Sequence, residues 1–122
     1  MNRFYTSIEQ SKHLLSLGLN PESADMFYQW IADAIIIDVG DIPYEDSGCC
    51  IPCWSVGALL EVMPNIPDCT IIFAKAKGKY GMCITPLDSG LALNEVEADT
   101  PIEVVYNMVI WLLENGYIDK GE

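Results

Sequence analysis

The residues of this sequence best suited to chemistry are five cysteines, of which Cys49, Cys50 and Cys53 form a cluster. Cys50 and Cys53 make a C-x-x-C motif, a spacing at which two thiolates can chelate zinc or form a redox pair. A structural zinc site needs four ligands, so Cys69 or Cys83 would have to complete it. The odd number of cysteines favours the alternative, free thiols that serve as small buried side chains in a reducing compartment. We therefore expect no metal and no cofactor, and keep Cys50 and Cys53 as candidates for a thiol or zinc site.

Other catalytic patterns are missing from the sequence. His13 is the only histidine, and it is expected at a solvated helical position beside Lys12. The sequence holds no glycine-rich phosphate loop, no G-x-S-x-G motif and no H-E-x-x-H motif. Carboxylates are plentiful, but no spacing singles out a pair for acid–base catalysis. We predict that the protein is not an enzyme.

The acidic balance argues against direct binding of nucleic acid. Eighteen Asp and Glu residues against six Lys and Arg residues give a formal net charge of −12, whereas nucleic-acid binding relies on basic residues that neutralise phosphates. An acidic chain can instead imitate DNA and block a nucleic-acid-binding protein, which requires many negative groups on one side. In this alternative two acidic sets would have to meet in space: Asp38, Asp41, Glu45 and Asp46 with Glu95, Glu97, Asp99 and Glu103.

Local patterns predict three helices and at least four strands. The helices are expected at Ser7–Leu17, Trp54–Met63 and Pro101 to about Asn115. The last has the clearest start, because Thr100 can cap it and Pro101 suits the first helical position. Strands are expected at Met26–Ile31, Ala34–Val39, Thr70–Ala76 and Tyr80–Thr85, with a further short strand at Leu91–Leu93.

Two features refine the strand pattern. Three consecutive isoleucines in Ala34–Val39 favour a central strand that is buried on both faces. The segment that follows, Gly40–Pro52, is expected to be a loop. Lys75, Lys77 and Lys79 surround the tip of the clearest hairpin. These lysines either bind an acidic ligand or protect an exposed strand edge from aggregation.

These elements predict a single α+β domain over residues 1–122. We expect a mainly antiparallel sheet of four to five strands, packed with about three helices in two layers. A hydrophobic share of 51% allows a core without disulfides or metal. No uncharged apolar run approaches the roughly 18 residues of a membrane span, and the first ten residues do not resemble a signal peptide. We therefore expect a cytoplasmic protein that does not enter a membrane.

The last helix carries two apolar stripes, whereas an ordinary surface helix has one. Val104, Met108 and Trp111 form the second stripe, which either contacts a partner or is buried between the sheet and the first helix. The strand Met26–Ile31 raises the same question, because Phe27, Tyr28 and Trp30 alternate between its faces. Exposed aromatic residues are frequent anchors of interfaces. We predict an interface at Val104, Met108, Trp111, Phe27, Tyr28 and Trp30.

Three segments carry a resemblance to known sequences. They are Ser11–Met26 (SKHLLSLGLNPESADM), Pro52–Pro64 (PCWSVGALLEVMP) and Thr100–Tyr117 (TPIEVVYNMVIWLLENGY). Together they resemble a group of small, acidic proteins of gut bacteria, uncharacterised and often encoded near phage-like or mobile elements. No activity is assigned to that group, so the resemblance implies an accessory or host-interaction role and no catalytic residue.

The sequence therefore predicts a non-enzymatic interaction or accessory module. Such a module would self-associate, as a homodimer or another homo-oligomer, or would dock on a protein partner. The acidic DNA mimic and the thiol or zinc site remain as alternatives.

Overall fold

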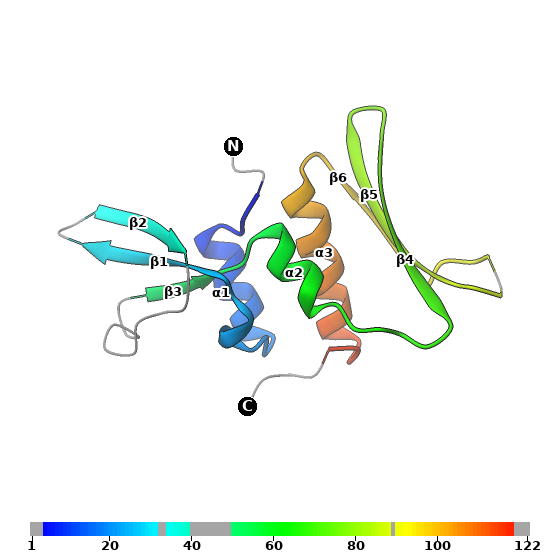
Figure 1. Ribbon diagram of the computed structural model, residues 1–122, viewed down its shortest axis with the longest axis horizontal. Helices are drawn as coiled ribbons and strands as arrows, with labels where there is room; N and C mark the ends of the chain where they lie inside the picture. Colours follow the sequence, from blue (N-terminus) through cyan, green and yellow to red (C-terminus); the bar gives the residue numbers. More distant parts are fainter. Residues whose placement is uncertain (1–3, 32–33, 40–49, 89, 119–122) are drawn as a thin grey trace.

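The structure is a computed structural model of the 122-residue chain, and it describes residues 4–31, 34–39, 50–88 and 90–118. In these ranges three helices lie between two small antiparallel sheets (Figure 1). The elements in chain order are α1 (Ile8–Ser16), the 3-10 turn η1 (Pro21–Ser23), β1 (Met26–Ile31), β2 (Ala34–Val39), β3 (Cys50–Cys53), α2 (Val56–Val62), β4 (Cys69–Ala76), β5 (Lys79–Pro86), β6 (Asn94–Ala98) and α3 (Pro101–Glu114). The predicted α+β class and antiparallel pairing are confirmed.

α1 and α3 begin after residues whose types favour a helix cap, Ser7 and Thr100. The Ser7 hydroxyl accepts the backbone N–H of Gln10, and the Gln10 side chain accepts the N–H of Ser7 in return. At the start of α3 the Thr100 hydroxyl accepts the N–H of Glu103. After α3, Gly116 adopts a positive φ of 78°, a conformation that favours glycine and ends a helix.

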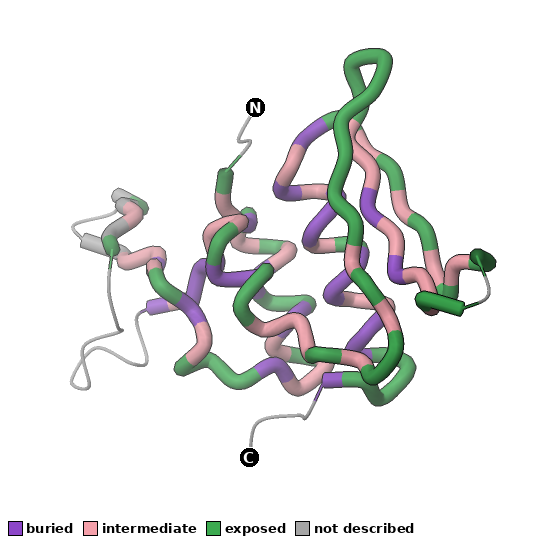
Figure 2. The backbone as a smooth tube through the Cα atoms, turned by 45° about the vertical axis from the view of Figure 1, so that its right-hand side comes forward, coloured by how far each residue is buried: buried purple, intermediate pink, exposed green. Residues whose placement is uncertain are grey.

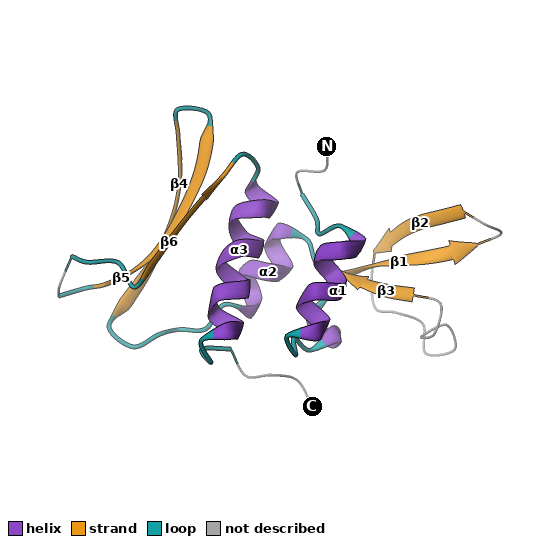
Figure 3. Ribbon diagram, turned by 180° about the vertical axis from the view of Figure 1, so that it is seen from behind, coloured by secondary structure: helices purple, strands orange, loops and turns teal. Residues whose placement is uncertain are grey.

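The strands form two sheets of three, not one sheet of four to five. The first sheet has the order β2-β1-β3 and the second has the order β4-β5-β6. β3 overlaps the end of the segment Gly40–Pro52 that was expected to be a loop. β6 begins at Asn94, directly after the short strand expected at Leu91–Leu93. Pro52 favours a loop by its type, but β3 pairs only with β1 among the described strands, and an edge strand tolerates proline. The helices therefore fill the space between two sheets (Figure 3).

β2 is an edge strand, so the prediction of a central strand there is wrong. The central strand of the first sheet is β1, and the side chains of Ile35 and Val39 in β2 are exposed. β-branched residues fit the extended backbone of any strand. The isoleucines therefore predicted the strand correctly but not its place in the sheet.

α3 lies at the centre of the core and is enclosed by the chain itself. It packs on β5 and β6, contacts α2, and reaches α1 through Tyr106, whose hydroxyl lies 2.7 Å from Nδ1 of His13. Buried positions recur along the whole helix (Figure 2), and Val104 and Met108 are both 0% exposed. The predicted interface at Val104 and Met108 is therefore wrong, because the second sheet and the other helices cover both apolar stripes. In the described ranges no helix has the length and apolar character needed to cross a membrane.

The burial of α3 predicts a large loss of stability on truncation. The change Met108→Ala should lower the free energy of unfolding by about 2–5 kcal/mol, because it removes buried contacts and leaves a cavity. Asn107→Ala is the matched control: Asn107 is exposed on the same helix, and we expect a change within about 0.5 kcal/mol. Urea denaturation measures both values, and equal effects would contradict the enclosure of α3.

Candidate interaction surface

The C-x-x-C motif does not form a chelating pair. Cys50 and Cys53 lie three residues apart on β3, and residues an odd number apart on a strand point to opposite faces of the sheet. Both are buried. Within the described residues no three His, Cys, Asp or Glu side chains cluster as metal ligands would, and Cys49 lies outside those residues. The geometry of β3 therefore contradicts a shared thiol or zinc site at Cys50 and Cys53.

Cys53 belongs to a buried polar network that joins β3 to the segment before α1. Its thiol donates to the carbonyl oxygen of Thr6 at 3.3 Å, and the Tyr28 hydroxyl donates to the same oxygen at 2.7 Å. The Thr6 hydroxyl contacts the Ser11 hydroxyl at 2.8 Å and accepts the N–H of Trp54 at 3.0 Å. Burial raises the pKa of the Cys53 thiol to about 11, so the thiol stays neutral and can donate its hydrogen bond to Thr6.

The two β1 aromatic residues whose side chains are described, Phe27 and Tyr28, do not offer an exposed anchor. Phe27 is buried, so the prediction of an interface at Phe27 is wrong. Tyr28 is half-buried, and its ring meets that of Tyr5 edge-on at 6.5 Å. Burial raises the pKa of Tyr28 above its usual value, because its hydroxyl is enclosed near Thr6. Trp30 lies on β1, but its side chain is outside the described part of the structure.

Trp111 is the member of the α3 stripe that keeps part of its surface exposed. Its ring stacks on Tyr117 with the centroids 5.3 Å apart and the planes 18° apart. A shallow hollow of about 320 Å³ lies beside Tyr117, between Leu19, Val62 and Ile118. The stack places the Tyr117 ring against α3, so an internal contact reduces the exposed area of Trp111.

The acidic residues do not gather as the DNA-mimic alternative requires. Asp38 belongs to β2 in the first sheet, whereas Glu95 and Glu97 belong to β6 in the second. The helices lie between these two sheets (Figure 1). The positions 41, 45 and 46 lie outside the described residues. The members of the two acidic sets whose positions are described therefore lie in different sheets, with the helices between them.

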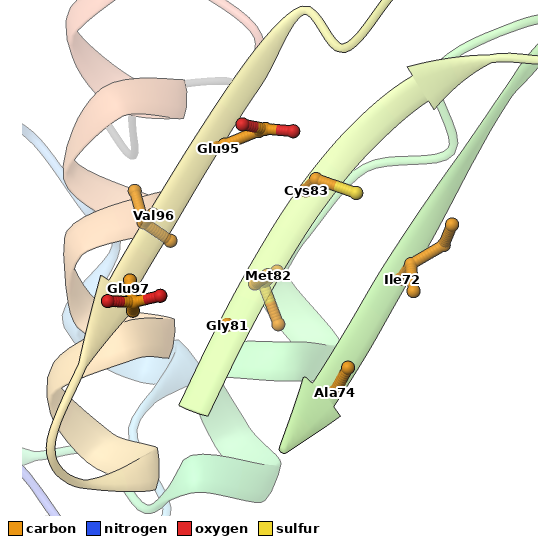
Figure 4. Close-up of a pocket in the computed structure, with 8 residues that line it drawn as sticks. All are labelled: Ile72, Ala74, Gly81, Met82, Cys83, Glu95, Val96 and Glu97. Atoms are coloured by element: carbon orange, nitrogen blue, oxygen red, sulfur yellow. The ribbon is translucent and has the colours of Figure 1, made fainter. Parts of the chain in front are cut away.

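The second sheet has one covered face and one bare face. Met82 and Ile84 of β5 point to α3 and are buried. The opposite face, which we call the outer face, carries the large apolar side chain of Ile72 among small and acidic residues. These residues line a depression of about 470 Å³ (Figure 4): Ile72, Ala74, Gly81, Cys83, Glu95 and Glu97. No other described element covers this face, so it is open to a ligand or a partner.

β4 is the most exposed strand of this sheet. α3 packs on β5 and β6, and only Cys69 and Ile71 at the start of β4 pack partly against the core. Both faces of β4 are accessible at its middle: Ile72 on the outer face is 48% exposed, and Phe73 on the inner face is 42% exposed. Three exposed leucines, Leu87, Leu91 and Leu93, follow in the β5–β6 connection. The second sheet and this connection thus hold five of the ten large apolar side chains that are exposed in the described residues.

The backbone of β4 also faces solvent on the side away from β5, which we call the β4 edge. The Leu87 N–H donates to the Asp68 carbonyl at 2.8 Å, and this pair continues the β4–β5 register by one step. Hydrogen-bonded pairs alternate in an antiparallel ladder, so even-numbered residues of β4 bond to β5. The N–H and C=O groups of Ile71, Phe73 and Lys75 therefore point outward along the β4 edge, where no other described strand pairs.

The sequence of β4 contains a signal for this surface, although the signal also fits an ordinary covered strand. Residues 71, 73, 75 and 77 share one face of the predicted strand, and both faces carry a large apolar residue at its middle. Such a strand suits a sheet covered on both sides, whereas here α3 is too narrow to cover β4. The lysines at the hairpin tip are consistent with an exposed edge, one of the two interpretations that the sequence leaves open.

The network around Cys53 predicts a chemically silent thiol. At pH 8 a thiol with a pKa near 11 is only about 0.1% thiolate, and thiolate is the reactive form. We expect iodoacetamide to modify half-exposed Cys83 at least about tenfold faster than Cys53, with the difference lost in urea. Peptide mass spectrometry of timed samples measures both rates, and equal rates in the folded protein would contradict the network.

Comparison of the chain with models of protein families, with curated proteins and with solved structures gives no match. The resemblance carried by Ser11–Met26, Pro52–Pro64 and Thr100–Tyr117 therefore stays a prediction. The β4 edge and the outer face are interpreted from their own geometry.

Proposed function

We propose that the protein is a non-enzymatic, cytoplasmic interaction module that binds along the β4 edge, either to another protein or to a second copy of itself. The observation that carries this proposal is an eight-residue edge strand with exposed Ile72 and Phe73 at its middle and outward-facing backbone groups. A strand of a partner can add to such an edge: main-chain hydrogen bonds supply affinity, and alternate side chains supply specificity.

The proposal of a non-enzymatic role is supported by how the reactive side chains are used. His13, the only histidine, contacts the Tyr106 hydroxyl at 2.7 Å and so links α1 to α3. The Cys53 thiol is hydrogen-bonded within the core. Asp25 accepts the N–H of Ser55 at 3.0 Å and also accepts its hydroxyl, at the start of α2. Each of these groups has a structural partner that explains its position.

The proposed cytoplasmic location is supported by the cysteines. Cys53, Cys69 and Cys83 are free thiols. Free thiols are typical of reducing compartments.

Substitution of Lys75 tests the β4 edge. Its N–H points away from β5, so Lys75→Pro removes an outward donor without removing a hydrogen bond to β5. Lys75→Ala is the matched control, because it removes the same charge and keeps the N–H. We expect the wild-type protein and Lys75→Ala to capture the same partner from native-cell lysate, and Lys75→Pro to capture at least about tenfold less.

Quantitative mass spectrometry compares the three captures, and titration of the purified partner then gives its affinity for each protein. Circular dichroism confirms that Lys75→Pro is folded. Equal affinity for all three proteins would overturn the assignment of the β4 edge as the binding surface.

A further inference from the structure

Opposite charges flank the two ends of β4. At the hairpin tip stand Lys75, Lys77 and Lys79, half of the six basic residues of the chain. Lys79 lies 3.9 Å from Glu97 and Lys75 lies over the Tyr80 ring, whereas Lys77 is exposed and has no ion pair in the described ranges. At the other end Asp68 and Asp88 are exposed and lie close together, because Leu87 bonds to Asp68.

We propose that the partner at the β4 edge is a second copy of this chain, paired through β4 in an antiparallel arrangement about a twofold axis at Phe73. The proposal rests on the proposed function and specifies its partner. The β4-β5-β6 sheets of the two copies would join into one continuous sheet of six strands.

The backbone geometry permits this pairing. A twofold axis perpendicular to the sheet places the outer faces of both copies on the same side of the joined sheet. Odd-numbered residues of one β4 strand therefore lie opposite odd-numbered residues of the other, and even-numbered opposite even-numbered. With Phe73 opposite Phe73, Ile71 of one copy lies opposite Lys75 of the other. All three are residues whose N–H and C=O groups point outward, so every such pair can exchange two hydrogen bonds.

The side chains on both faces gain apolar contacts. On the inner face the two Phe73 rings meet across the axis, in the area that α3 leaves uncovered. Phe73 is already tilted against Tyr80 with the ring centroids 6.2 Å apart, so the pair extends an existing aromatic contact. On the outer face Ile72 lies beside Ala74 of the second copy. These contacts bury the exposed middle of β4.

Charge complementarity favours a second copy of this chain as the partner and favours its antiparallel pairing through β4. In the proposed register Lys77 lies opposite Cys69 of the second copy, one residue from Asp68. The symmetric operation repeats that contact, so the dimer has two attractive pairs despite a net charge of −12 per chain. The opposite edge of the sheet is disfavoured, because pairing β6 with β6 would bring Glu95 and Glu97 close to their own copies.

The first test is the mass in solution. We expect sedimentation equilibrium of the wild-type protein to give a concentration-dependent mass that rises from 13.5 kDa to twice that value. Lys75→Pro and Phe73→Glu should each raise the dimer dissociation constant at least about tenfold, and Lys75→Ala should leave it within about threefold. A strictly monomeric wild-type protein, or a dimer unaffected by Lys75→Pro and Phe73→Glu, would overturn the proposal.

A charge exchange tests the register. Lys77→Glu and Asp68→Lys should each weaken self-association. Each variant brings two charges of the same sign together at positions 77 and 68, and the twofold symmetry repeats this repulsion at both ends of the dimer. An equimolar mixture of these two variants should recover a dimer close to wild-type strength, since the mixed dimer has an attractive pair at both ends. Native mass spectrometry identifies the mixed dimer by its mass. A statistical mixture with no preference for the mixed dimer would overturn the antiparallel register.

The outcomes separate this inference from the proposed function. A monomer whose capture of another protein is lost in Lys75→Pro and kept in Lys75→Ala refutes self-association and leaves the β4 edge as a binding surface. A dimer that all the β4 variants leave intact refutes both.

Discussion

The architecture depends on the need to bury α3 on more than one side. Seven of its 14 residues are buried, and they lie on both of its apolar stripes. Three short helices cannot enclose one another, so a sheet must cover the remaining side. β5 and β6 do this, while α1 and α2 cover the opposite side. The division of the strands into two small sheets follows, since the helical layer separates β1–β3 from β4–β6 (Figure 1).

The packing of α3 on β5 and β6 also explains why β4 is exposed to solvent. A single helix covers about two strands of a sheet, because its diameter is about 10 Å and strands are spaced by about 4.8 Å. α3 lies along β5 and β6, so the third strand extends beyond it. Phe73 points to the helical side and is nevertheless exposed, which shows that the sheet is wider than its cover. The exposed strand is thus a consequence of how the core is closed.

Local structure could be predicted from the sequence, and the arrangement of the elements could not. The bounds of β1 and β2 and the caps at Ser7 and Thr100 agree with the pattern of nearby residues, because capping and alternation act over a few positions. Whether Met108 contacts a partner or β6 depends on which strands pair, and that depends on residues far apart in the chain. The candidate surface was missed for the same reason: the exposure of β4 is a property of the width of α3 relative to the sheet.

An exposed edge with apolar side chains is a hazard for aggregation, and the residues around β4 limit that hazard. The lysines at the tip repel any strand that carries positive charge at that end, and Asp68 repels acidic strands at the other end. A partner must therefore present acidic groups to the tip and basic groups to the opposite end. An antiparallel copy of β4 meets both conditions with the residues already present, whereas a parallel copy meets neither. The charges that protect the edge are thus also those that give it a preferred occupant.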